Sequence, residues 1–62
     1  MQNETEIHPG SKWRDGQRQL FRVITVTEVD GHTWVHYRSE RSAQEYTCWV
    51  PSFLERFTHD AD

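Results

Sequence analysis

The sequence lacks the features on which several classes of protein depend. It has one cysteine, Cys48, so no disulfide can form within the chain. No apolar run approaches the roughly 20 residues that a membrane-spanning helix needs, and no segment forms a long amphipathic helix that would lie on a membrane. A charged-then-apolar secretion leader is missing too. We therefore expect a cytoplasmic protein without membrane contact.

The usual patterns of metal sites and catalytic sites are missing as well. His32 and His36 share a face of a predicted strand, but four strand residues separate them by about 13 Å, too far for one zinc ion with bonds of about 2 Å. Cys48 lies between Tyr46 and Val50 in a predicted strand, where a free cysteine is more often a small buried hydrophobe than a nucleophile. We therefore expect no enzyme activity, no cofactor and no metal.

Positive charge is scarce. Lys12 is the single lysine, and the chain has a net charge of −3 with a pI near 5.7. Non-specific affinity for nucleic acid needs a local excess of Lys and Arg, so this balance argues against a general polyanion binder. Four acids lie near the ends of the chain, and the segment 10–57 is nearly neutral. These four are Glu4, Glu6, Asp60 and Asp62.

Aromatic residues, by contrast, are abundant. The 62 residues are only 34% hydrophobic, with a mean hydropathy of −0.96, but they include three Trp, three Phe and two Tyr. A chain of this length buries about 60% of its unfolded surface, and each aromatic side chain can bury roughly 150–250 Å². The composition therefore predicts one small folded domain with a narrow stability margin.

The segment 20–37 predicts a β-hairpin. Two runs rich in β-branched and aromatic residues flank Asp30-Gly31, a dipeptide suited to the positive φ angles of a type I′ turn. The predicted pairs are Val29 with His32, Val26 with Val35 and Ile24 with Tyr37. Alternation then places Ile24, Val26, Val35 and Tyr37 on one face and Val23, Thr25, Thr27, Trp34 and His36 on the other.

The first half of this hairpin carries apolar residues on both faces, at Leu20, Phe21 and Val23. A strongly bent strand, a strand buried on both faces, or a β-bulge near Arg22 would each explain this pattern. The sequence leaves the three explanations open.

The residues before the hairpin predict little regular structure. The polar, acidic segment 1–9 is expected to be a disordered lead. Residues 11–14 then fit a short edge strand held by Trp13, and Asp15-Gly16 predicts a turn into the hairpin.

After the hairpin, the polar segment 38–44 predicts a loop, and 45–50 alternates as a fourth strand that Pro51 ends. Tyr46, Cys48 and Val50 share one side of this strand, and Glu45, Thr47 and Trp49 share the other.

Residues 52–57 predict a short helix that begins with a capping box formed by Ser52 and Glu55. Its apolar face contains Phe53 and Phe57 and is expected to cover the open end of a barrel. A polar tail, 58–62, should follow.

These elements predict a mainly β fold in one domain spanning 10–57. We expect a small four-stranded antiparallel meander, forming an SH3-like barrel or a bent sheet, closed by a short C-terminal helix. Such a sheet has edges to protect, and a homodimer that pairs two edges would protect them.

Four motifs follow one another along the chain: a G-x-x-W entry at 10–13, an F-R-V strand at 21–23, a V-x-Y-R strand at 35–38 and a W-V-P…F-L-x-R-F ending at 49–57. In these motifs the chain resembles small bacteriophage, prophage and bacterial proteins with SH3-like folds. The resemblance implies a fold and a mobile-element origin. It implies no catalytic residues.

Surplus aromatic residues favour a non-enzymatic binding module. The expected binding residues are Trp34, His36, Trp49, Arg22 and Arg38, since Trp, Tyr and Arg anchor protein interfaces. A protein partner is the main expectation, namely a host protein if a phage encodes the chain. The alternatives are a nucleic-acid-binding barrel, in which the tryptophans stack bases, and a self-associating structural module. Burial of one or both tryptophans as a second core layer is equally compatible with the sequence.

Overall fold

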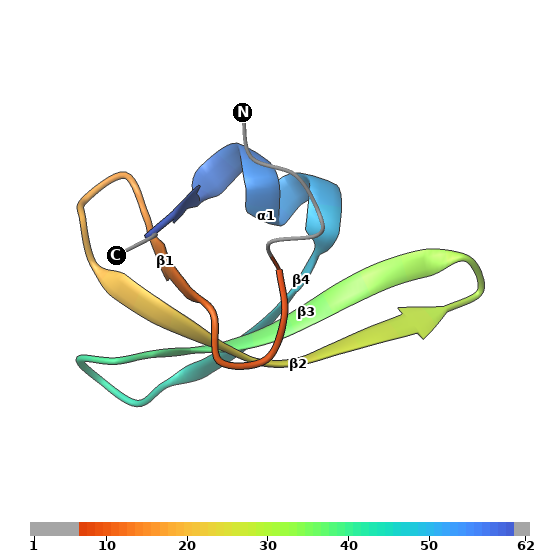
Figure 1. Cartoon of the computed structure of the whole chain (residues 1–62), viewed down its shortest axis with the longest axis horizontal. Helices are drawn as coiled ribbons and strands as arrows, with labels where there is room; N and C mark the ends of the chain where they lie inside the picture. Colours follow the sequence, from red (N-terminus) through yellow and green to blue (C-terminus); the bar gives the residue numbers. More distant parts are fainter. Residues whose placement is uncertain (1–6, 61–62) are drawn as a thin grey trace.

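The computed structural model describes residues 7–60, which form five antiparallel strands and one helix (Figure 1). The mainly β prediction is confirmed. The strands pair in the order β4-β3-β2-β1-β5, and the helix lies between β4 and β5 in sequence. The elements are β1 (Lys12–Arg14), β2 (Leu20–Val29), β3 (His32–Ser39), β4 (Glu45–Trp49), α1 (Val50–Arg56) and β5 (Thr58–His59).

The β2–β3 hairpin turns at Asp30-Gly31, as predicted. Both residues have positive φ, 53° and 79° respectively, which is the requirement of a type I′ turn. Val29 pairs with His32 and Val26 with Val35, so the predicted register holds for the distal half of the hairpin. This half projects away from the helix (Figure 1).

A β-bulge at Ile24 changes the register of the proximal half. Val23 pairs with Tyr37 and Thr25 pairs with His36, which leaves Ile24 without a partner. The predicted pairing of Ile24 with Tyr37 is therefore wrong, and so is the placement of Val23 on the face of Thr25. The bulge near Arg22, one of the three explanations for the mixed apolar pattern, is the one observed, because one extra residue reverses the alternation of side chains.

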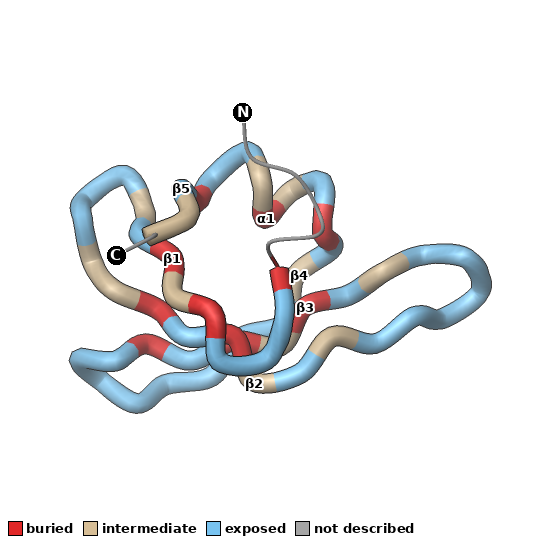
Figure 2. Tube along the Cα trace, in the orientation of Figure 1, coloured by how far each residue is buried: buried red, intermediate tan, exposed pale blue. Residues whose placement is uncertain are grey.

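The core lies between one face of the sheet and α1 (Figure 2). Trp13 is fully buried, with its ring 5.1 Å from that of Phe53 in an edge-to-face contact, a favoured geometry for aromatic pairs. The buried hydrophobic residues are Ile7, Trp13, Phe21, Val23, Val35, Tyr37, Val50, Phe53 and Phe57.

A hydrogen-bonded chain ties the start of the described segment to this core. The Trp13 indole nitrogen donates to Ser11 Oγ at 3.1 Å, and Ser11 Oγ donates to the carbonyl oxygen of His8 at 2.6 Å. Ile7 is buried beside them. Residues 7–9 are therefore ordered, in contrast to the expected disordered lead over 1–9, while residues 1–6 lie outside the described part. Residues 7–9 have little apolar content, so the sequence did not indicate that they pack against the core.

Two further predictions about strands were wrong. The strand at Trp13 is not an edge, because β1 lies between β2 and β5. The sheet has five strands rather than four, because Thr58 and His59, expected in the polar tail, pair with Arg14 and Trp13. A two-residue strand with polar side chains shows no alternation that a sequence pattern can reveal.

The helix starts earlier than predicted. It begins at Val50, with Trp49 at the N-cap position and no side-chain capping bond. The capping box of Ser52 and Glu55 is therefore wrong, because Pro51 occupies the first turn, where its fixed φ and missing N–H are well tolerated. The predicted apolar face is present, since Phe53 and Phe57 are buried.

The sheet is open. Among residues 7–60, β4 and β5 form its two edges and do not pair with each other, so the sheet does not close into a barrel. In the same range no helix is long and apolar enough to cross a membrane.

Substitution of Trp13 by alanine should remove most of the stability. Truncation of a buried Trp costs about 3–5 kcal/mol, whereas a chain of this length has roughly 3–9 kcal/mol in total. The matched change Trp34→Ala, at an exposed position, should cost about 1 kcal/mol or less. Urea denaturation followed by circular dichroism measures both, and equal losses would contradict the assignment of the core.

Candidate functional site

The five residues predicted to bind lie on one face of the sheet, the face opposite α1, which we call the outer face. Trp34, His36 and Arg38 alternate along β3 with the buried Val35 and Tyr37. Across the strands, Trp34 pairs with Trp49 and Arg38 pairs with Arg22, so β2 and β4 supply the other two. The bulge is needed for this arrangement, because without it Arg22 would share a face with Val26 and Val35.

The two tryptophans form one end of the outer face. Trp34 is 40% exposed and Trp49 is 42% exposed. They are directly paired on neighbouring strands, a relation that places the Cβ atoms about 4.5–5.5 Å apart. The sequence left open whether these side chains form a second core layer, and this exposure shows that they do not.

Sequence reasoning missed two residues that extend this apolar end. Val29 pairs with His32 on the same face and is 51% exposed. The His32 ring contacts the Trp49 ring edge-to-face, with centroids 5.9 Å apart. The sequence could have indicated both residues, because the predicted pair of Val29 and His32 lies on the same strand face as Trp34. The predicted binding set contained only Trp, Arg and His36 side chains.

The middle of the outer face is polar and held by hydrogen bonds. His36 Nε2 lies 2.8 Å from Glu45 Oε1, and His36 Nδ1 lies 3.1 Å from Thr47 Oγ1. Both ring nitrogens therefore have a partner on β4. His36 is fixed across the β3–β4 pair and separates the tryptophans from the arginines.

The other end of the outer face is cationic. Arg22 Nε forms an ion pair with Glu40 Oε2 at 2.8 Å. Arg38 is exposed, and no ion pair of its guanidinium is found in the described part of the chain. Glu45, the residue opposite Arg38, is instead bonded to His36. Arg38 is therefore the arginine of this face whose charge is available to a ligand.

Cys48 lies on the core side of β4, and its environment differs from that of a nucleophilic thiol. Burial raises the pKa of the Cys48 thiol above its usual value of 9, and the nearby Arg56 charge offsets only part of this effect. Nucleophilic cysteines instead have a lowered pKa. Within residues 7–60, no group of three or more His, Cys, Asp or Glu side chains is arranged to hold a metal ion.

The raised pKa predicts how Cys48 affects stability at alkaline pH. Because the native thiol holds its proton more tightly than the unfolded thiol, its stabilising contribution is complete below about pH 9 and is lost as the pH rises through the native pKa. The stability of the wild type relative to Cys48→Ala should therefore fall as the pH rises above about 9. Urea denaturation under reducing conditions measures this difference, and an increase with pH would contradict the prediction.

Comparison with known proteins adds no family to this description. No protein-family model matches the chain, and no curated protein and no solved structure is significantly similar to it. The function must therefore be inferred from the outer face itself, with its exposed tryptophan pair, its fixed histidine and its available arginine.

Proposed function

We propose that this protein is a non-enzymatic binding module that binds another protein through its outer face. The observation that carries the proposal is the exposed pair of Trp34 and Trp49. Two of the three tryptophans lie outside the core of a chain with few apolar residues to spare. Contiguous exposed apolar surface commonly marks an interaction site, and Trp and Arg are the most frequent anchors of protein interfaces.

The arrangement of the outer face specifies the chemistry of the partner. Its apolar end, formed by Val29, Trp34 and Trp49, suits an aliphatic or aromatic side chain. Arg38 lies four residues along β3 from Trp34, a distance of about 13 Å in a strand, and suits a carboxylate. The partner segment should therefore present an apolar anchor and an acidic side chain separated by roughly that distance.

The fold supports a module of this kind. We infer an SH3-like arrangement from the open antiparallel sheet and the helix that covers one face. Such a scaffold leaves the opposite face of β2, β3 and β4 open to a partner. The resemblance to phage and prophage proteins makes a host protein of the cytoplasm the partner class of this proposal.

Selection from a random peptide library tests the predicted recognition chemistry. Peptides enriched on the wild-type protein should combine an aromatic or large aliphatic residue with Asp or Glu. Their affinity should fall at least tenfold with Trp34→Ala or Trp49→Ala, because interface hot spots contribute about 2 kcal/mol or more. The change Arg38→Gln should cost roughly tenfold, since it removes a charged hydrogen bond.

Arg18→Gln is the matched control, because Arg18 is an exposed arginine in the β1–β2 loop, away from the outer face. It should leave peptide affinity unchanged. Circular dichroism must show that each variant remains folded. Enrichment of peptides without acidic residues, equal losses with Arg18→Gln, or a dimer that buries both tryptophans would contradict the proposal.

Nucleic-acid binding is the second candidate, and one observation favours it. Arg22 and Arg38 stand directly opposite each other on the face that exposes the two tryptophans, a combination suited to phosphate contact and base stacking. On this alternative, affinity for single-stranded oligonucleotides should fall steeply between about 50 and 200 mM salt. Fluorescence titration of Trp34 and Trp49 at the two salt concentrations measures it, and the absence of binding at low salt excludes it.

A further inference from the structure

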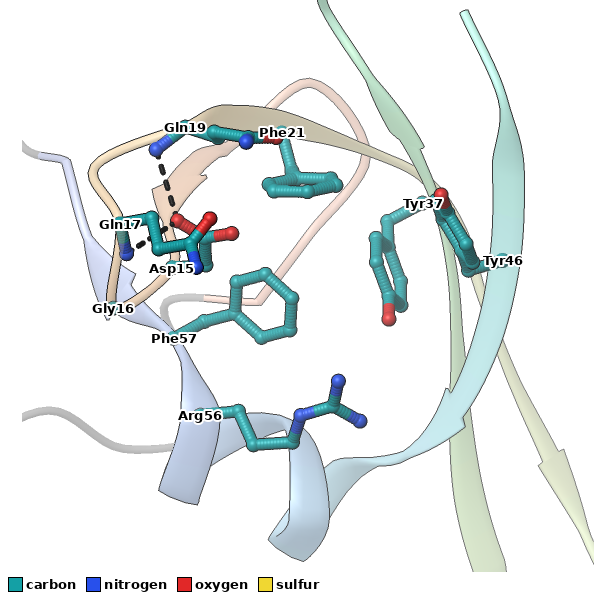
Figure 3. A pocket seen from close by; sticks show the side chains of 9 residues that line it. All are labelled: Asp15, Gly16, Gln17, Gln19, Phe21, Tyr37, Tyr46, Arg56 and Phe57. Atoms are coloured by element: carbon teal, nitrogen blue, oxygen red, sulfur yellow. Dashed lines mark hydrogen bonds between the residues drawn. The ribbon is translucent and has the colours of Figure 1, made fainter. Parts of the chain in front are cut away.

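A groove on the helix side of the sheet is separate from the outer face (Figure 3). It has a volume of about 580 Å³, within the range of small-molecule sites. The β1–β2 loop forms one wall, and the end of α1 and the strands β2, β3 and β4 form the rest. The lining residues are Asp15, Gly16, Gln17, Gln19, Phe21, Tyr37, Tyr46, Arg56 and Phe57.

One part of the groove is aromatic. The rings of Phe21 and Phe57 are 5.2 Å apart and nearly perpendicular, and Tyr46 stacks on Tyr37 at 5.5 Å. Phe21, Tyr37 and Phe57 are buried, whereas Tyr46 is 40% exposed. Tyr46 therefore presents a ring surface that the core does not cover, although its position in β4 predicts a core side chain.

Two hydrogen-bond donors lie together beside this aromatic wall. The Arg56 guanidinium and the Tyr37 hydroxyl both point into the groove from neighbouring sides (Figure 3). Arg56 is exposed and has no ion pair within the described residues. Burial raises the pKa of Tyr37 above its usual value of 10, although the Arg56 charge acts to lower it. The phenol therefore stays protonated at neutral pH and can donate.

The carboxylate of the opposite wall is already engaged. Asp15 Oδ1 accepts hydrogen bonds from the backbone N–H groups of Gln17 and Gln19, both at 2.9 Å. These bonds shape the loop and direct one carboxylate oxygen to the backbone. Asp15 keeps its negative charge on the loop wall, whereas the Arg56 guanidinium, which has no ion pair within the described residues, lies beside Tyr37 on the opposite wall.

We propose that this groove binds a small aromatic carboxylate. Its carboxylate group accepts hydrogen bonds from Arg56 and Tyr37, and its ring packs against Tyr46. A guanidinium paired with a carboxylate makes a strong charge-assisted hydrogen bond, and the aromatic wall supplies the apolar contact that such pockets use. This site lies on the other side of the sheet from the outer face, so it is independent of the proposed protein-binding function.

Arg56 also has a simpler explanation, because a basic residue in the last turn of a helix interacts favourably with the helix dipole. It lies 6.0 Å from the centroid of the Phe57 ring as well. Neither role depends on a ligand. A measurement of ligand preference, rather than of stability, therefore separates them.

Titration with 3-phenylpropanoate and with its neutral amide, followed by NMR of the full chain, tests the proposal. The carboxylate should bind about tenfold more tightly than the amide, with the largest shifts at Tyr37, Tyr46 and the Arg56 side chain. Arg56→Gln should abolish this preference, and Arg56→Lys should retain part of it. Arg41→Gln, at an exposed arginine that does not line the groove, should leave it unchanged.

No binding at millimolar ligand would overturn the proposal. Equal affinity for acid and amide, or a preference that survives Arg56→Gln in a folded variant, would overturn it as well. Shifts centred on Trp34 and Trp49 would also overturn it, because they would place the ligand on the outer face. Loss of the groove site would leave the peptide-binding test of the outer face unaffected.

Discussion

The structure depends on one irregularity in backbone pairing, the β-bulge at Ile24. One extra residue in β2 reverses the alternation of side chains, so Phe21 and Val23 join Val35 and Tyr37 over the helix. The same reversal moves Arg22 to the outer face, where it pairs with Arg38. The bulge thus supplies the proximal half of the core and the cationic end of the outer face together.

The chain contains few large apolar side chains, so their distribution between the core and the outer face is informative. The core is closed by aromatic rings on one side of the sheet, around the buried Trp13 and Phe53. The outer face receives no such cover, yet it contains Trp34, Trp49 and Val29 with 40–51% exposure. Large apolar side chains are scarce in a domain of this size, yet three of them stay exposed on this face, which is why we propose that they serve recognition.

Much of the fold could be predicted from local patterns. The Asp30-Gly31 turn, the distal register and the exposed side of β4 follow from turn chemistry and period-two alternation. The residues of the outer face could be named as well, although not the contribution of Val29 and His32. The bulge was one of three options, because a mixed apolar pattern alone does not locate the extra residue.

The remaining features depend on contacts distant in sequence. Pairing of Thr58–His59 with β1 and burial of Ile7 involve short or polar segments without periodicity. The helix starts at Val50 because the first turn of a helix tolerates a proline such as Pro51. The N-cap pattern at Ser52 had predicted a later start. The groove requires the β1–β2 loop, three strands and the end of α1 to meet, so no single stretch of sequence indicates it.

The central claim is that one tryptophan builds the core and two lie exposed on the outer face, where we propose that a partner binds. Paramagnetic relaxation of the three indole N–H signals by a soluble gadolinium chelate tests this claim most directly. The account predicts strong broadening for Trp34 and Trp49 and an unaffected signal for Trp13. Equal protection of all three signals would contradict it.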